Sequence, residues 1–241
     1  VTELPYEIED WDESGYSYVW IKVPRVNKYS NVDYIYMYYN NTSAIDNQDK
    51  TAVWDDNYKT VWHMDGLGST INDSTQNNNS PSLPSTWTWD SGGSISDSLE
   101  FTYQTPYTGA AMLPTGVGDS GDWTISFWIQ GERMGSGSTW NDQLIVTSGR
   151  STGGLMIGAF GKPPESRIRY TDYNNNMERD LDENIFGGNG FDLYTLSKDR
   201  NGGSGGIPRF NIYRNGSHRD TFDQPQDSSP GTIYLGSEFG N

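Results

Sequence analysis

The sequence has 241 residues and no cysteine, so it can bury a sizeable core without disulfides and offers neither a thiol nucleophile nor a Cys-based zinc site. Its 32 acidic and 16 basic side chains give a net charge of −16, which argues against nucleic acid or an anionic membrane as a partner. Only 33% of residues are hydrophobic, but 14% are aromatic, so large rings can fill a core.

No stretch approaches the run of about 20 apolar residues that spans a bilayer, so membrane insertion is not expected. The chain opens on Val1 rather than Met and shows no signal peptide, which leads us to expect a processed or partial chain. The acidity fits solubility, adaptation to salty water or cation capture, and the sequence leaves these three readings open.

The first strand signals are residues 18–23 (YVWIKV) and 33–39 (DYIYMYY), which are rich in β-branched and aromatic residues. A turn-rich segment separates them, so we predict two antiparallel strands. The polar stretch 40–49 follows, and we predict a domain boundary that leaves a partial N-terminal β module at residues 1–57 and a second domain at residues 58–241.

Short strand candidates then recur between clusters of Gly, Asn, Ser and Asp, with no sustained helical period. They are residues 60–64, 98–103, 123–129, 143–147, 154–160, 167–170, 191–196, 209–213 and 232–235. This pattern predicts an all-β, two-sheet antiparallel sandwich with residues 69–93 and 116–121 as loops on its rim.

Two local patterns are especially clear. In residues 123–129 the side chains of Trp123, Ile125, Phe127 and Ile129 fall on one face, which predicts a strand with one face in the core. The dipeptide Asn215-Gly216 follows another alternating run and predicts a type I′ hairpin turn.

Four motifs occur in order: VWHMD at 61–65, DSTQN at 73–77, LEF at 99–101 and WTISFW at 123–128. Their order and spacing resemble the laminin-G-like members of the concanavalin A-like lectin/glucanase superfamily, although Gln76 stands where that family commonly has Gly. The resemblance implies a jelly roll. The family's closing strand has no counterpart here, so we expect the jelly roll to lack its last strand.

The front of the chain, TELPYEIE at 2–9, VWIKVP at 19–24 and IYMYY at 35–39, resembles the second half of a small β module of unknown function. Such modules commonly precede laminin-G-like domains in prokaryotic surface proteins. This resemblance says nothing about chemistry.

Hydrolases of the superfamily use two carboxylates on one concave strand, and no such pair is found, so we assign no catalytic residue. The acidic run at residues 7–13 (EIEDWDE) has the wrong spacing and is expected to be an exposed edge. Glu100 and Asp192 are isolated carboxylates in strands. The only two histidines, His63 and His218, are too few and too far apart in sequence to suggest a zinc triad without carboxylate ligands, and we expect His63 to pack beside Trp62.

Calcium is the more credible metal, because it takes oxygen ligands from flexible loops. Asp65, Asn72 and Asp73 lie in such a loop and are the candidate ligands. Sugar-binding members of the superfamily stack aromatic rings on pyranose faces, so rings in polar surroundings are candidate ligand-binding residues. These are Trp87, Trp89, Tyr107, Trp140 and Tyr173. The competing interpretation is that each of these rings covers a sheet end.

These observations favour a non-enzymatic protein of the cell exterior, cell surface or virion surface that binds a glycan or a surface protein. A structural role in an appendage, filament or virion surface, where other chains supply strands, is the alternative. A glycoside hydrolase of the same superfamily is the third hypothesis.

Overall fold

The structure is a computed structural model that describes residues 2–66, 68–83, 85, 87–101, 111–112, 121–130, 141–147, 155–161, 167–172, 177–183, 190–223 and 234–235. The described chain is almost entirely β, and all of its paired strands are antiparallel. Its helical elements are one turn of α-helix, α1 (Lys50–Val53), and a 3₁₀ turn, η2 (Ser204–Gly206). The predicted all-β class is confirmed.

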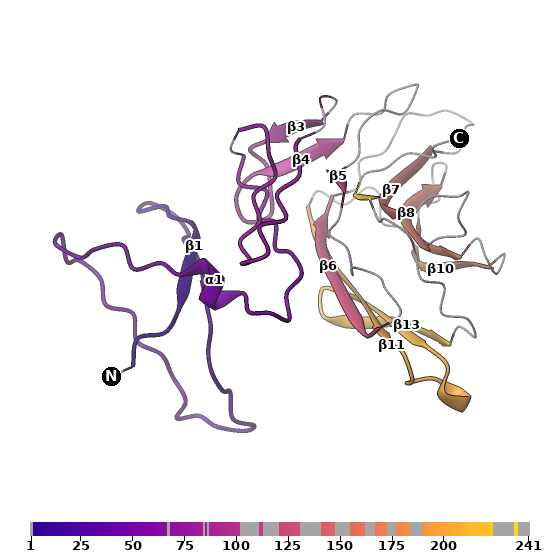
Figure 1. Ribbon diagram of the computed structural model, residues 1–241, viewed down its shortest axis with the longest axis horizontal. Coiled ribbons are helices and arrows are strands. Elements are labelled where there is room, and N and C mark those ends of the chain that lie inside the picture. Colours follow the sequence, from indigo (N-terminus) through magenta and orange to yellow (C-terminus); the bar gives the residue numbers. More distant parts are fainter. Residues whose placement is uncertain are drawn as a thin grey trace.

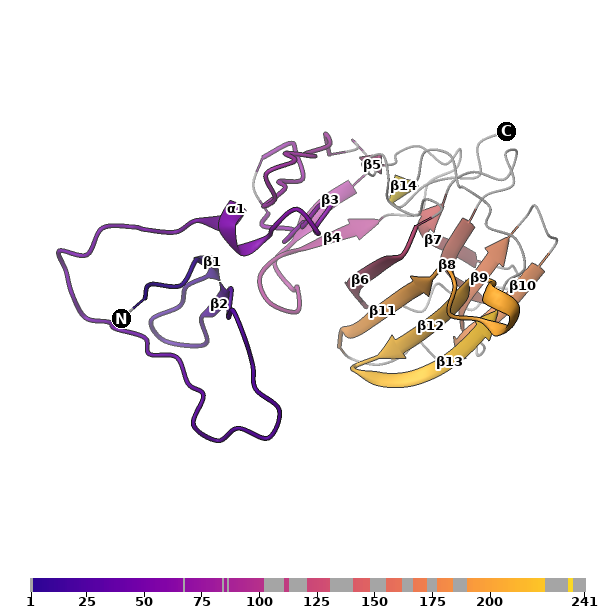
Figure 2. The same cartoon turned by 60° about the horizontal axis from the view of Figure 1, so that its bottom comes forward.

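The largest sheet has six strands in the order β10-β9-β8-β7-β14-β5. They are β5 (Ala111–Met112), β7 (Asn141–Thr147), β8 (Leu155–Gly161), β9 (Arg167–Asp172), β10 (Met177–Glu183) and β14 (Tyr234–Leu235). A second sheet has four strands in the order β13-β12-β11-β6. They are β6 (Trp123–Ile129), β11 (Asp192–Asp199), β12 (Arg209–Arg214) and β13 (Ser217–Asp223). The two sheets lie side by side in both views (Figures 1 and 2).

The four-stranded sheet buries one face. Its residues Tyr194, Leu196, Phe210, Ile212 and Phe222 are all at most 5% exposed. Phe210 and Phe222 are opposite each other in the register and stack with ring centroids 5.0 Å apart. Strand β6 alternates as predicted, with its odd-numbered residues the more buried.

The β12–β13 connection is the predicted hairpin. Asn215 and Gly216 both have positive φ, at 50° and 74°, as a type I′ turn requires. The side chain of Asn215 also accepts a hydrogen bond from the Leu193 backbone at 2.9 Å, which ties the turn to β11.

Two short hairpins make up the rest. Strands β1 (Tyr6–Asp10) and β2 (Tyr18–Ile21) pair near the N-terminus, and β3 (Trp87–Asp90) pairs with β4 (Ser98–Phe101). The β1–β2 hairpin and α1 lie at one end of the molecule, away from the two larger sheets in both views (Figures 1 and 2). A small core of Ile71 and Trp87 lies beside β3 and β4.

Three expectations fail. Residues 33–39 form no strand, and β2 pairs with β1 instead. Residues 60–64 contribute only an isolated bridge, between Trp62 and Asp73. The predicted loop at residues 69–93 contains β3, because Trp87 becomes a core residue whose strand pairs with β4.

Candidate functional site

The most concentrated group of buried ionisable side chains surrounds His63. Its Nε2 lies 3.1 Å from a carboxylate oxygen of Glu7, and its Nδ1 lies 3.1 Å from one of Glu9. Both glutamates belong to β1 and point toward the His63 ring, and Glu9 lies where the pairing of β1 with β2 shifts register. The three side chains are only 12%, 10% and 5% exposed. Because each ring nitrogen faces a carboxylate, both carry a proton and the imidazole is positively charged.

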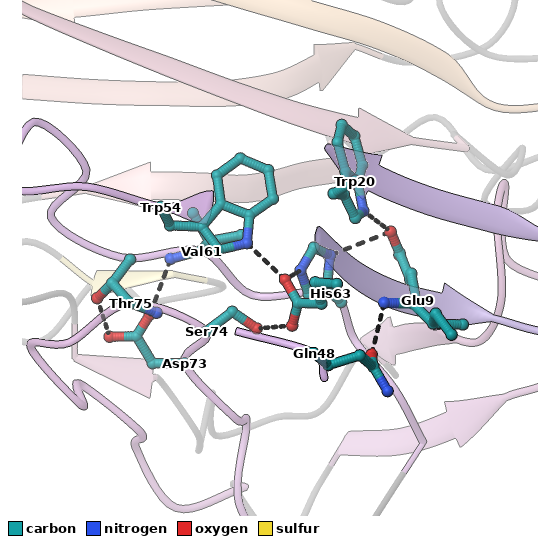
Figure 3. Close-up of polar contacts among 11 residues, drawn as sticks. Glu9, Trp20, Gln48, Trp54, Val61, His63, Asp73, Ser74 and Thr75 are labelled. Atoms are coloured by element: carbon teal, nitrogen blue, oxygen red, sulfur yellow. Dashed lines mark hydrogen bonds and ion pairs between the residues drawn. The ribbon is translucent and has the colours of Figure 1, made fainter. Parts of the chain in front are cut away.

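Two indole rings, those of Trp20 and Trp54, lie beside His63 (Figure 3). The His63 ring stacks on Trp20 of β2 with centroids 5.9 Å apart and packs at an angle against Trp54, 5.7 Å away. Each indole N–H also donates to one carboxylate: Trp20 to Glu9, and Trp54 to Glu7 at 2.5 Å. His63 therefore packs against both Trp20 and Trp54, which also contact each other with ring centroids 5.2 Å apart, a placement that the expected packing beside Trp62 did not foresee.

Further bonds link this group to two distant segments. The Ser74 hydroxyl donates to the second Glu7 oxygen at 2.6 Å, and the Gln48 side chain accepts from the Ile8 backbone at 2.6 Å (Figure 3). The expectation that residues 7–13 are an exposed acidic edge is wrong for Glu7 and Glu9, because His63 and two indoles compensate for their burial. The spacing of these carboxylates can be compared with that of hydrolases. Such a comparison cannot identify His63, which is 56 residues from Glu7, as their partner.

The environment shifts two pKa values. Burial alone would lower the pKa of His63, but the hydrogen bonds and negative charges of Glu7 and Glu9 outweigh burial and raise it to about 9. Burial alone would raise the pKa of Glu7, yet the bonds from His63, Ser74 and Trp54 outweigh burial and lower it. The network is therefore charged at neutral pH.

The predicted calcium ligands are only partly together. Asn72 donates to Asp65 at 2.9 Å. Asp73 is 3% exposed, and each of its oxygens accepts two hydrogen bonds from residues 61–79. Oδ1 accepts from the Val61 and Thr75 backbones, and Oδ2 from the Thr75 hydroxyl and the Asn79 backbone. Among the residues that the structure describes, no group of three or more His, Cys, Asp or Glu is arranged to hold a metal ion. Calcium stays a prediction.

Of the predicted ligand-binding rings, Trp87 is 5% exposed and packs on Ile71. Trp89 is half-buried against the same cluster and donates to the Gly68 carbonyl at 3.1 Å. Tyr107, Trp140 and Tyr173 lie outside the described residues. The two isolated strand carboxylates also differ in their surroundings: Asp192 pairs with Arg214 at 2.6 Å, whereas Glu100 is exposed on β4.

Sequence reasoning missed an exposed aromatic segment, residues 29–39, which we call the tyrosine segment. Its residues Tyr29, Tyr34, Tyr36, Tyr38 and Tyr39 are 69–93% exposed. Tyr34 and Tyr36 meet edge to face at 5.3 Å, and the Lys28 ammonium lies 4.8 Å from the centre of the Tyr29 ring. The signal for this segment is the run of aromatic residues at 33–39, from which the sequence predicts a paired strand.

Fold and site together describe an all-β protein with antiparallel sheets, a buried ion-pair network near its N-terminus and exposed rings in a long loop. Residues 1–91 match a family model described as a domain of unknown function, DUF2341. No curated protein and no solved structure matches the chain. No helix among the described residues combines the length and apolar character that crossing a bilayer requires.

The family match agrees with the expected module of unknown function at the front of the chain, and it runs past the predicted boundary at residue 57. The bonds from Glu7 to His63 and Ser74 also cross that position. The division into residues 1–57 and 58–241 stays a prediction.

Proposed function

We propose that the chain is a non-enzymatic binding module of an extracellular, cell-surface or virion-surface protein, and that it adheres to a glycan or a partner protein. The observation that carries this proposal is the tyrosine segment, whose five rings are 69–93% exposed. Contiguous apolar side chains on a soluble protein commonly mark an interaction site. Tyrosine suits such a site because its ring stacks on apolar faces while its hydroxyl forms hydrogen bonds.

We further propose that residues 58–241 form a jelly roll of the laminin-G/concanavalin type, with a calcium ion held near Asp65, Asn72 and Asp73. Two adjacent antiparallel sheets, one of them with a continuous buried face, support the jelly roll. The calcium proposal rests on the proximity of Asp65 and Asn72; a bound calcium ion would replace the hydrogen bond that the Asn72 amide donates to Asp65 with contacts to their side-chain oxygens.

A structural role in an appendage, filament or virion surface is the second candidate, favoured by the same exposed segment if another chain covers it. A glycoside hydrolase ranks third. The carboxylates of Glu7 and Glu9 both belong to β1, but both are engaged by His63 and by indole N–H groups.

A glycan-array screen of the intact chain, with calcium and with EDTA, tests the binding proposal. The triple variant Tyr34→Ser/Tyr36→Ser/Tyr38→Ser should lose binding, whereas Tyr16→Ser, equally exposed at 84% but outside the tyrosine segment, should keep it. Binding that EDTA abolishes would support the calcium proposal. A chain that binds no glycan would favour the structural role, and binding that survives the triple variant would remove the tyrosine segment from the site.

A further inference from the structure

Residues 33–39 have the composition of a strand but no strand partner. Six of the seven residues are Tyr, Ile or Met, and all six have exposed side chains. Tyr and Ile are enriched in strands, and an uncharged aromatic run of this length is typical of segments that pair between chains. The segment belongs to the long loop between β2 and α1, which extends away from the two larger sheets (Figures 1 and 2).

The backbone of this segment is also unpaired. Within the described part of the chain, residues 34–39 make no backbone hydrogen bond; the nearest ones are Ser30 to Asn27 and Ala44 to Asn41. A run of free N–H and C=O groups beside exposed apolar side chains is what an added strand satisfies.

We propose that residues 33–39 pair, antiparallel, with the same residues of a second copy of this chain, about a two-fold axis at Tyr36. This inference deepens the proposed binding function and rests on the same segment. Two-fold symmetric dimers, in which the same patch of both copies meets, are the commonest oligomers of soluble proteins.

The sequence is compatible with that register. Pairing about Tyr36 places Tyr34 opposite Tyr38 and Ile35 opposite Met37, so aromatic meets aromatic and aliphatic meets aliphatic. Tyr34, Tyr36 and Tyr38 share one face of the resulting ribbon. Asp33 falls opposite Tyr39, so no like charges oppose each other.

The charge distribution favours contact at this place. Residues 25–45 contain two basic side chains, Arg25 and Lys28, and one acidic side chain, Asp33, so their net charge is 2 − 1 = +1, against −16 for the whole chain. Two copies would therefore meet through a segment that lacks the negative charge of the rest of the chain. Salt should strengthen the pairing, because it screens the repulsion between the remaining acidic surfaces.

Sedimentation of the intact chain over a wide concentration range, at low and high salt, tests the inference. Because an isolated two-stranded ribbon is marginal in water, the dimer should be weak and concentration-dependent. Two single variants, Ile35→Pro and Tyr36→Pro, probe the ladder. In an antiparallel pair the N–H groups of successive residues point alternately toward and away from the partner. One of the two prolines should therefore weaken dimerisation by about a hundredfold or more, and the other much less.

The controls Ile35→Thr and Tyr36→Thr keep the N–H and place a β-branched side chain, which favours a strand, at each position, and both should still dimerise. A wild-type chain that stays monomeric at every concentration and salt would overturn the inference, as would two prolines with equal effects. The glycan array separates this outcome from failure of the proposed function: a monomer whose glycan binding depends on the tyrosine segment would refute the pairing and leave the binding function standing.

Discussion

Burying the His63 ring against Glu7 and Glu9 replaces the water around three ionisable groups with bonds inside the chain. The contribution of these bonds to the free energy of unfolding depends on pH, because the ring attracts both carboxylates only while it is protonated. The raised pKa, about 9, means that the folded state binds a proton more tightly than the unfolded state, where histidine titrates near 6.5. This contribution to stability is complete below pH 6.5, declines as the pH rises toward 9 and is absent above that value.

The first prediction follows from this linkage. Wild-type protein should lose about 3 kcal/mol of unfolding free energy between pH 6 and pH 10, and His63→Gln should remove most of that slope. Urea unfolding at a series of pH values measures it. His218→Gln is the matched control, because His218 is exposed and bonds to Thr221 rather than to a carboxylate. A wild-type chain whose stability does not change over this range would contradict the assignment of a charged His63.

Glu7 acts at the opposite end of the pH scale. Its lowered pKa contributes stability above about pH 4.5, and that stability is lost as the pH falls through the folded-state value. Together, Glu7 and His63 stabilise the N-terminal region most between about pH 4.5 and 6.5.

At the scale of single elements, the β12–β13 hairpin allows a clean test of backbone conformation. Gly216 has a φ of 74° with open space around its missing Cβ, so alanine there meets no atom but must adopt the left-handed region. Gly216→Ala should lower the unfolding free energy by about 1 kcal/mol. Gly190→Ala is the control, because Gly190 also has open space but no positive φ. Equal effects of the two substitutions in thermal unfolding would argue against a type I′ turn.

Elements that carry an apolar period were predictable from the sequence. The alternation in β6 predicts a strand, and the Asn215-Gly216 dipeptide predicts a turn, without reference to any distant residue. Both elements form where the sequence predicts them. Strand β10 reads MERDLDE and shows no such period. Strand β1 reads YEIED and does alternate, but Glu7 and Glu9 face His63. Strand β1 buries carboxylates rather than aliphatic groups, which is favourable only because His63 lies against it.

Residues 33–39 fail in the opposite sense. Local propensity favours a strand, but a strand also needs a hydrogen-bonded neighbour, and in the described chain the β1–β2 sheet ends at β2 without adding residues 33–39. The local sequence predicts that a segment favours extended backbone. It does not predict which other segment will pair with it. The same limit explains why the His63 network was not foreseen.

For the whole molecule, the net charge of −16 opposes compaction. Adding potassium chloride should therefore raise the melting temperature, since screening weakens the repulsion among exposed carboxylates. Calcium chloride at matched ionic strength separates screening from ion binding: an additional rise that EDTA reverses would support a bound calcium ion. A melting temperature that falls with moderate salt would indicate that attractive ion pairs, such as Arg209 with Asp223, outweigh the repulsion.

The contacts of β1 also set an order of events during synthesis. Glu7 is made 56 residues before His63 and 67 residues before Ser74. At a translation rate of about 5–20 residues per second, Ser74 is synthesised roughly 3 to 13 s after Glu7. Through that interval Glu7 and Glu9 are hydrated anions on a hairpin too small to be stable alone. The carboxylates that end up buried thus first keep this stretch of the nascent chain hydrated, and they lose that role when the His63 side chain reaches them.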